Sequence, residues 1–148
     1  MEIFIAPAKS IKSRLRVPGD KSITHRALML ATMADGESTI TGFCPCADCY
    51  STLACLQLMG LRASLRNGQE TMRLSGMGMR NFSEPDCILP AGNSGTTIRL
   101  LSGILAGQNI FAVMNGDQSL NRRPMLRVVE PLRHMGALIL GRENGASD

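Results

Sequence analysis

One segment of this 148-residue chain occurs twice. Residues 19–28 (GDKSITHRAL) align with residues 92–101 (GNSGTTIRLL) at a constant offset, because 92 − 19 and 99 − 26 both equal 73. In each copy a small, polar, glycine-containing stretch precedes an apolar helical pattern, with an arginine one turn in. This suits an anion at a helix N-terminus, where free N–H groups and the positive dipole end point outward. The repeat therefore predicts one supersecondary unit used twice, in a protein that handles phosphate or carboxylate groups.

Periodicity and turn signals extend the repeat into two units of order β-α-β-α-β-β. In the first unit we expect strands at 14–17, 37–41, 62–65 and 71–74, with a hairpin turn at Asn67-Gly68, and helices at 22–33 and about 48–59, the latter with Asp48 as N-cap. In the second unit we expect strands at 87–89, 109–114 and 137–140 and helices at 96–106 and 124–135. The chain is therefore predicted to be α/β (α+β), with units at 14–80 and 81–148. The second unit stops before its last strand, as in a fragment of a longer protein.

Composition narrows the class of protein. Hydrophobic residues make up 44% of the chain, which is enough for a core, and no apolar run approaches the roughly 20 residues of a membrane span. The first residues lack the basic and apolar regions of a signal peptide, so we expect a cytoplasmic protein with no membrane association. The net charge of +4 is modest and aromatic residues are only 3%. A nucleic-acid binder more often shows a basic run with aromatic platforms, so a small anionic substrate is favoured over nucleic acid.

Cysteines gather in Cys44-Pro45-Cys46-Ala47-Asp48-Cys49. A metal site is one interpretation, but no second pair of Cys or His lies at metal-ligand spacing. We therefore expect reduced thiols at a strand-to-helix turn, no metal and no cofactor.

The first copy of the repeat offers a phosphate or carboxylate clamp. Lys21 supplies an ammonium and Ser22 a hydroxyl at the helix start, and Arg26 follows four residues later on the same face. The alternative is a capped surface helix whose charges are merely solvated.

The second copy and the segment after it offer further anion contacts. Gly95 permits close backbone approach to a ligand, with Asn93 and Thr96 as neighbouring donors. The loop is neither a Walker A motif nor a Rossmann fingerprint, and an ordinary N-cap with a small-residue packing contact is the alternative. Further on, two arginines precede a proline that suits the first turn of a helix. We expect Arg123 to point into a cleft and Arg122 to face solvent.

Taken together, PGDKS, GNSGTT and RRPM resemble the enolpyruvyl transferase superfamily, in its branch that acts on shikimate-3-phosphate. The likeness runs from about residue 8 to residue 137. It implies an inside-out α/β barrel of two domains, each with three β-α-β-α-β-β units, of which this chain holds two from the N-terminal domain. Residues 1–13 would form a strand associated with an absent C-terminal domain, because family members are nearly three times this length.

The resemblance also implies ligands and roles. Lys21, Ser22 and Arg26 would contact shikimate-3-phosphate. Phosphoenolpyruvate would contact Lys21, Asn93, Gly95, Thr96 and Arg123. The implied reaction adds the 5-hydroxyl of shikimate-3-phosphate to C2 of phosphoenolpyruvate and releases phosphate, on the shikimate pathway to chorismate and aromatic amino acids. No cofactor is implied, the full-length protein would be a monomer, and the acid/base groups would lie outside this chain.

Some departures and alternatives accompany the resemblance. Pro90 stands where the family usually has Asp, and Asn121 where it commonly has a basic residue. Gly95 is typical of members inhibited by glyphosate, so we expect the full-length enzyme to be sensitive; unchanged inhibition of a Gly95→Ala enzyme would contradict this. The sister enzyme that uses UDP-N-acetylglucosamine has Lys-Asn in place of Lys21-Ser22 and usually a cysteine before the Arg-Pro region. The fragment alone could also act only as a weak phosphate-ligand-binding module.

Overall fold

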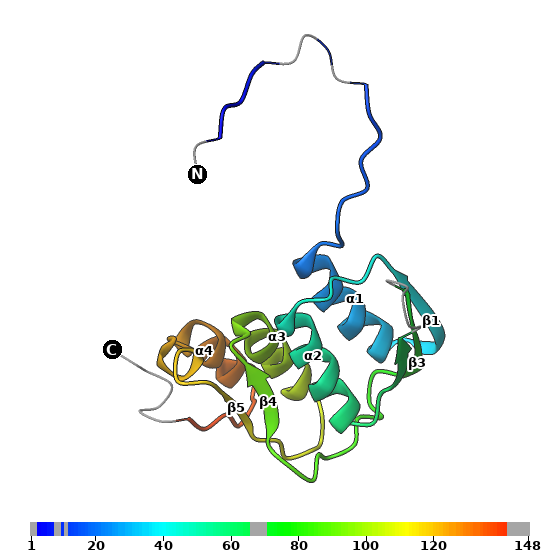
Figure 1. Cartoon of the computed structure of the whole chain (residues 1–148). Coiled ribbons are helices and arrows are strands. Elements are labelled where there is room, and N and C mark those ends of the chain that lie inside the picture. Colours follow the sequence, from blue (N-terminus) through cyan, green and yellow to red (C-terminus); the bar gives the residue numbers. More distant parts are fainter. Residues whose placement is uncertain (1–2, 8–9, 11, 66–70, 142–148) are drawn as a thin grey trace.

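The computed structural model describes residues 3–7, 10, 12–65 and 71–141. The chain folds into a mixture of helices and strands (Figure 1). The elements are α1 (Lys21–Met33), β1 (Asp35–Thr41), α2 (Ala47–Leu58), β2 (Arg62–Leu65), β3 (Thr71–Met77), β4 (Leu89–Gly92), α3 (Gly95–Leu105), β5 (Met114–Gly116), the 3-10 turn η1 (Leu120–Arg122) and α4 (Leu126–His134). None of the described helices is both long and apolar enough to cross a lipid bilayer.

The two repeated helices begin at side-chain caps. The Asp20 carboxylate accepts a hydrogen bond from the Ile23 N–H at 2.7 Å at the start of α1. The Ser94 hydroxyl accepts one from the Thr97 N–H at 3.1 Å at the start of α3. Each cap satisfies one of the four free N–H groups of its helix, a contribution of about 1 kcal/mol. The caps are 74 residues apart, since 94 − 20 = 74, so the structural repeat differs from the sequence repeat by one residue.

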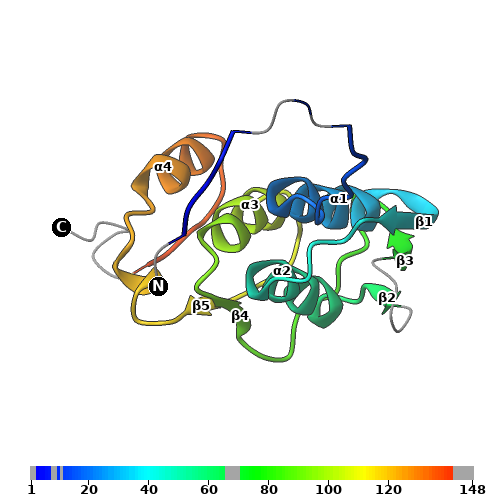
Figure 2. The same ribbon diagram turned by 45° about the horizontal axis from the view of Figure 1, so that its top comes forward.

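The strands form two separate sheets. β1 and β2 each pair antiparallel with β3, which gives the order β1-β3-β2. β4 and β5 pair in parallel, from Leu89 opposite Met114 to Gly92 opposite Gly116. Figure 2 shows α1, α2 and α3 side by side, with β1 and β3 beside α1 and β4 beside α2. The helices thus lie between the sheets of the two units.

One hydrophobic core joins both units. Leu28 of α1, Leu56 of α2, Leu74 of β3 and Leu101 of α3 are all at most 1% exposed. Burying each of these side chains stabilises the fold by roughly 1.5–3 kcal/mol. Because they belong to one cluster, the three helices are held at fixed positions relative to one another.

Glycine pairs let the backbone cross closely at the start of α1 and α3. A Cβ added at Gly19 would lie 1.8 Å from the carbonyl oxygen of Gly42, and one added at Gly116 would lie 2.7 Å from that of Gly92. Gly19 and Gly92 are equivalent in the repeat, and Gly42 and Gly116 each stand at or just beyond the strand that follows the helix. Both units therefore use the same backbone crossing below the helix N-terminus.

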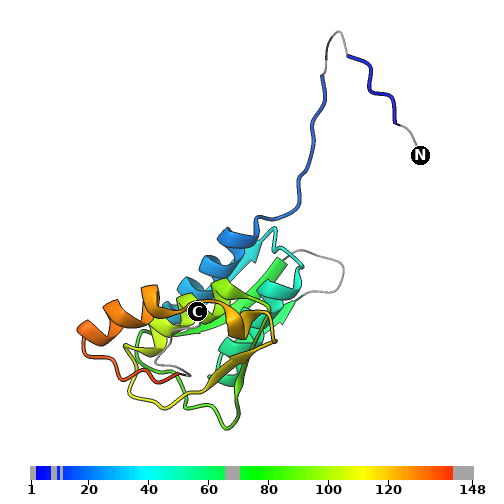
Figure 3. The same cartoon turned by 90° about the vertical axis from the view of Figure 1, so that its left-hand side faces the viewer.

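Several predicted strands are absent. Residues 14–17 and 137–140 have no regular structure. β5 shares only Met114 with the strand predicted at 109–114, and β4 shares only Leu89 with the strand predicted at 87–89. Residues 3–6 are likewise no strand in this structure, and residues 12–18 lead away from the body (Figure 3). A strand needs a neighbour to satisfy its N–H and C=O groups, and the described residues provide none at these places. The Asn67-Gly68 turn lies outside the described residues.

The starts of two helices also differ from prediction. Asp48 is not the N-cap of α2: Cys46 occupies that position and Asp48 lies in the first turn. Pro124 is not in the first turn of α4, which begins at Leu126 after Met125 as N-cap. The predicted cap of α2 is therefore two residues too late. The sequence does not distinguish the two positions, because an acidic residue is favourable both as a cap and in the first turn.

Candidate functional site

The N-terminal ends of α1, α2 and α3 meet at one place. Lys21, the first residue of α1, pairs through its ammonium with the carboxylate of Asp48 in α2 at 3.0 Å. The Cys49 thiol of α2 lies 3.7 Å from the Lys21 carbonyl oxygen, and the Thr97 hydroxyl of α3 lies 3.4 Å from that of Asp48. The positive dipole ends of three helices therefore converge, which favours an anion in front of them.

A buried chain of polar side chains connects the three helices behind this point. His25 Nδ1 of α1 lies 2.7 Å from the Thr52 hydroxyl of α2, which lies 2.7 Å from the Thr97 hydroxyl of α3. Thr97 in turn donates to the capping hydroxyl of Ser94 at 2.7 Å. All four residues are at most 2% exposed and hydrogen-bonded, so the network fixes the relative positions of the helix starts.

His25 makes stability depend on pH. Burial lowers its pKa below the ordinary 6.5; Asp48 opposes this shift, and Lys21 and Arg26 add to it. Below about pH 6.5 the unfolded chain therefore binds a proton that the folded chain does not, and the free energy of unfolding falls as pH falls. We expect full stability above that pH and a loss below it of at most about 1.4 kcal/mol per pH unit. Urea denaturation at several pH values measures this slope.

Two variants check the assignment. His25→Gln is expected to reduce the slope by up to one proton, whatever it does to stability at neutral pH. His134→Gln, at the other histidine, which is exposed, is expected to leave the slope unchanged. An equal slope in wild type and His25→Gln would show that another group is responsible.

A second set of contacts lies at the start of α3. The Arg123 guanidinium donates to the side-chain oxygen of Asn93, and the Asn93 amide donates to the Asp117 carboxylate at 2.6 Å. This bond, followed by one from the Leu120 N–H, lowers the pKa of Asp117 below its ordinary value. Asp117 therefore stays ionised and orients Asn93, which holds Arg123 beside the loop before α3.

Gly95 makes room for two guanidinium groups. A Cβ at this position would lie 2.5 Å from Nη1 of Arg99 and 3.2 Å from Nη1 of Arg123. Burial lowers the pKa of Arg99, with Arg127 and Arg123 adding to the shift, and its Nε has no partner among the described residues. Positive charge is thus concentrated at the N-terminus of α3 beyond what the helix dipole supplies.

The structure brings some predicted site residues together and keeps others apart. Asn93, Gly95 and Arg123 form one group, with Thr96 in the first turn of α3. Ser22 and Arg26 form another on α1, where Arg26 donates to the Ser22 carbonyl at 3.1 Å. Among the described residues, no hydrogen bond joins the α1 group directly to the α3 group. The first turn of α2 lies between the two groups.

Sequence reasoning missed several residues of this region. Asp48 was expected to cap a helix rather than to pair with Lys21, and Asp117 had no expected role. Nothing in the sequence pattern indicates the pairing of His25 with Thr52. An acidic residue near the start of a helix is a weak signal for the first of these, but the partners are 27 residues apart and the pairing follows from tertiary structure.

Three thiols are the only group of potential metal ligands that the described residues bring together. The Sγ atoms of Cys44, Cys46 and Cys49 all lie within 4.8 Å of one another, and those of Cys46 and Cys49 are 3.4 Å apart. Burial followed by contact with Cys46 raises the pKa of both Cys44 and Cys49. For Cys46 burial acts in the same direction, but hydrogen bonds from the other two cysteines outweigh it and lower the pKa.

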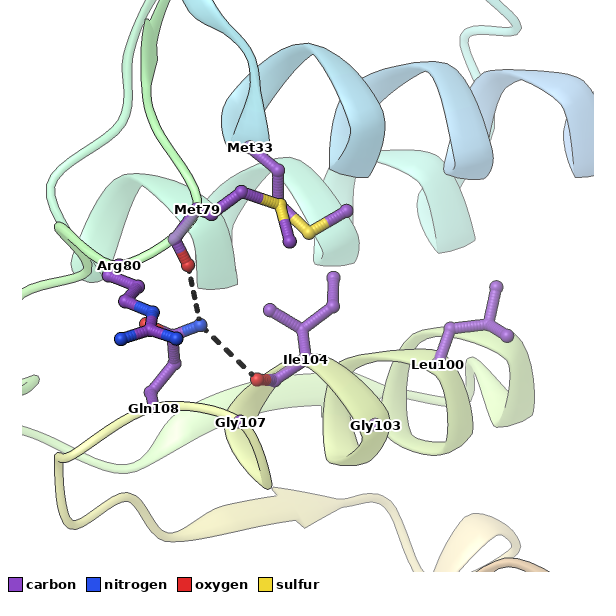
Figure 4. A pocket seen from close by; sticks show the side chains of 8 residues that line it. All are labelled: Met33, Met79, Arg80, Leu100, Gly103, Ile104, Gly107 and Gln108. Atoms are coloured by element: carbon purple, nitrogen blue, oxygen red, sulfur yellow. Dashed lines mark hydrogen bonds between the residues drawn. The ribbon is translucent and has the colours of Figure 1, made fainter.

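A pocket of about 390 Å³ lies away from these groups, at the C-terminal half of α3 (Figure 4). Met33, Met79, Leu100 and Ile104 line it with apolar side chains, and Gln108 bridges the carbonyls of Met79 and Ile104. Its lining contains none of the predicted site residues. Arg80 is the one charged residue among the described residues of the lining, whereas several helix N-termini and cationic side chains gather around α1 and α3, so the helix N-termini are the candidate site.

Known proteins match this chain over nearly its whole length. The family model described as EPSP synthase (3-phosphoshikimate 1-carboxyvinyltransferase) matches residues 5–147. The 3-phosphoshikimate 1-carboxyvinyltransferase of Herpetosiphon aurantiacus is 47% identical over 145 residues, which are 98% of this chain and 33% of that protein. The one of Gloeobacter violaceus is 52% identical over 142 residues, 95% of this chain and 33% of that protein.

Solved structures agree with the sequence relatives. EPSP synthase from Acinetobacter baumannii superposes with a TM-score of 0.83 at 39% identity, over 90% of this chain and 30% of that one. The predicted mixture of helices and sheets is thereby confirmed, while the closed barrel remains a prediction. The chain spans about a third of the length of the curated relatives that it matches.

Proposed function

Because the chain belongs to the EPSP synthase family, we propose that its gathered helix N-termini form part of a site for phosphoenolpyruvate and shikimate-3-phosphate. The reaction is transfer of the enolpyruvyl group to the 5-hydroxyl of shikimate-3-phosphate with release of phosphate. The observation that carries the proposal is the convergence of three positive helix ends with Lys21 and Arg123, in a chain of this family. Phosphate and carboxylate groups are the ligands that such a surface binds.

The side chains divide the work by position. Lys21, Ser22 and Arg26 lie on the first two turns of α1 and bind shikimate-3-phosphate. Lys21 also reaches phosphoenolpyruvate, which Asn93, Gly95, Thr96 and Arg123 contact from the α3 side. The hydrogen bond to the Asp48 carboxylate, followed by its charge, raises the pKa of Lys21, so the ammonium stays charged at neutral pH.

This chain orients the substrates and stabilises their negative charges. Hydrogen-bond donors that are already in place need not reorganise when charge develops in the transition state. This preorganisation is the largest contribution to catalysis in many active sites. The carboxylates and lysine that move protons are expected outside this chain. The whole protein acts as a cytoplasmic monomer without a cofactor, and Gly95 makes it sensitive to glyphosate.

Two other functions remain as competitors. The chain alone could bind phosphorylated ligands weakly without catalysis, since a cleft made from two domains loses preorganisation when one is removed. Transfer to UDP-N-acetylglucosamine is the second, and Ser22, where that sister enzyme has Asn, speaks against it.

Isothermal titration of shikimate-3-phosphate into the 148-residue chain tests the proposal. We expect saturable binding that Lys21→Ala and Arg26→Ala each weaken by about tenfold or more, since a hydrogen bond to a charged group contributes roughly 1.5–3 kcal/mol. Arg62→Ala, on exposed β2, is the matched control and should bind like the wild type. UDP-N-acetylglucosamine should produce no heat of binding.

If the chain alone binds nothing, the same titration is made on a protein that extends it to the length of its relatives. That result decides between a wrong assignment and an incomplete site. If the longer protein binds the ligand and turns it over, and Lys21→Ala abolishes both, the proposed reaction is supported. The isolated chain then holds only part of the site. Binding that Lys21→Ala and Arg26→Ala leave unchanged contradicts the proposed site.

A further inference from the structure

The cysteine cluster lies outside the proposed substrate contacts but next to them. Cys44 precedes α2, Cys46 is its N-cap and Cys49 is in its first turn. Sequence spacing alone argued against a metal, because no second pair of ligands was visible. The structure changes this, since Cys44 folds back toward the Cys46-x-x-Cys49 pair and supplies a third thiol.

We propose that Cys44, Cys46 and Cys49 form a three-thiolate site for a thiophilic cation such as Zn²⁺. Tetrahedral zinc with Zn–S bonds of about 2.3 Å requires sulfurs about 3.8 Å apart. The observed separation of 3.4 Å between Cys46 and Cys49, with all three sulfurs within 4.8 Å, is close to this requirement. The three sulfurs are therefore near the spacing that a bound ion needs.

Without a metal the site favours protonated thiols at Cys44 and Cys49, because burial raises the pKa of both, so the cation itself has to displace their protons. Metal-bound cysteines are deprotonated, so a site must stabilise negative sulfur. The N-terminus of α2, the positive end of its dipole, lies at the cluster, while the nearby Lys21 ammonium is paired with the Asp48 carboxylate at 3.0 Å. The Cys46 thiol donates to the Cys49 sulfur, and the Cys44 sulfur lies within 4.8 Å of both, so the three sulfurs are gathered before any ion binds.

The fourth coordination position is open to solvent. Cys49 is fully buried, whereas Cys44 and Cys46 are partly exposed. Zinc sites with three protein ligands commonly hold a water as the fourth. A bound ion would connect the loop before α2 to the first turn of α2, directly behind the Lys21 carbonyl that Cys49 contacts.

Metal titration of the reduced, metal-free 148-residue chain tests the proposal. Co²⁺ is expected to bind one per chain, with a thiolate-to-cobalt charge-transfer band and the visible bands of tetrahedral cobalt, and Zn²⁺ should displace it. Competition with a chromophoric chelator gives the Zn²⁺ affinity. Cys44→Ser and Cys46→Ser are each expected to lower the Zn²⁺ affinity by roughly tenfold or more. Loss of a group that only supports a metal ligand already has an effect of that size.

Cys87→Ser is the matched control, since this exposed cysteine lies outside the cluster. It should bind metal like the wild type. Cys49→Ser is less suitable as a test, because it changes a buried core residue. The variants of the two partly exposed cysteines, Cys44 and Cys46, are used to test the site in its place. No uptake of Co²⁺ or Zn²⁺ by the reduced chain would overturn the proposal. So would a metal affinity that Cys44→Ser leaves unchanged, because Cys44 would then not be a ligand.

Discussion

Gly19→Ala is expected to lower the free energy of unfolding of this chain by about 2–3 kcal/mol. The added Cβ would lie 1.8 Å from the carbonyl oxygen and 2.8 Å from the carbonyl carbon of Gly42. Both atoms are backbone, so no side chain can rotate away and the 42–44 loop or the start of α1 has to move. The corresponding fall in Tm is roughly 4–12 °C for a domain of this size.

Urea and thermal unfolding followed by circular dichroism measure this effect. Gly103→Ala is the matched control, because a Cβ there meets nothing within 4 Å in the interior of α3. That change should stabilise the chain by about 0.5–1 kcal/mol, the ordinary gain from replacing glycine in a helix. A Gly19→Ala chain as stable as the wild type would show that the crossing with Gly42 relaxes freely.

The same glycine crossing explains why the repeat was visible in the sequence. Gly19 stands before α1 because the carbonyl of Gly42 passes directly against it. Gly92 stands before α3 with φ +57°, and a Cβ there would lie 2.8 Å from the Ser51 hydroxyl, while the close approach to its own carbonyl requires glycine at Gly116. The polar residue that follows each glycine lies at or next to a helix cap. Local rules on caps and on periodicity therefore predicted both helices within one residue of their observed starts.

Strands were predicted less well, for a physical reason. β1 and β2 each form backbone hydrogen bonds with β3, and all three strands were found where expected, although β3 extends further, to Met77. The segments at 14–17 and 137–140 have strand-like sequences but no neighbouring strand among the described residues. A strand exists only with its partner, so a pattern within one segment cannot decide whether it forms.

The site shows the same division between local and tertiary information. Lys21 and Gly95 could be placed at helix starts from the repeat alone. The pairing of Lys21 with Asp48 and the hydrogen bond between Thr52 and Thr97 could not, because these partners are 27 and 45 residues apart. The helix dipoles were predictable one at a time, whereas their convergence depends on the shared core.

If the proposed function holds, Arg123→Ala is expected to weaken phosphoenolpyruvate binding by roughly 10–100-fold. Asn93 holds the guanidinium, and Asp117 orients Asn93 in turn, so Arg123 is positioned before the ligand arrives. Removing it loses charge-assisted hydrogen bonds to phosphate or carboxylate and leaves Asn93 without its donor. The measurement is phosphoenolpyruvate affinity in a protein that carries this chain at the length of its relatives.

Neighbouring variants separate position from charge. Arg122→Ala removes the same charge from the exposed adjacent residue and is expected to change the affinity by no more than about threefold, as for a screened surface charge. Arg123→Lys keeps the charge but loses the planar fork, so an intermediate loss is expected. Equal effects of Arg122→Ala and Arg123→Ala would mean that the net charge of this segment attracts the ligand. A selective effect of Arg123 would mean that the contact with Asn93 directs one guanidinium toward the place where the three helices meet.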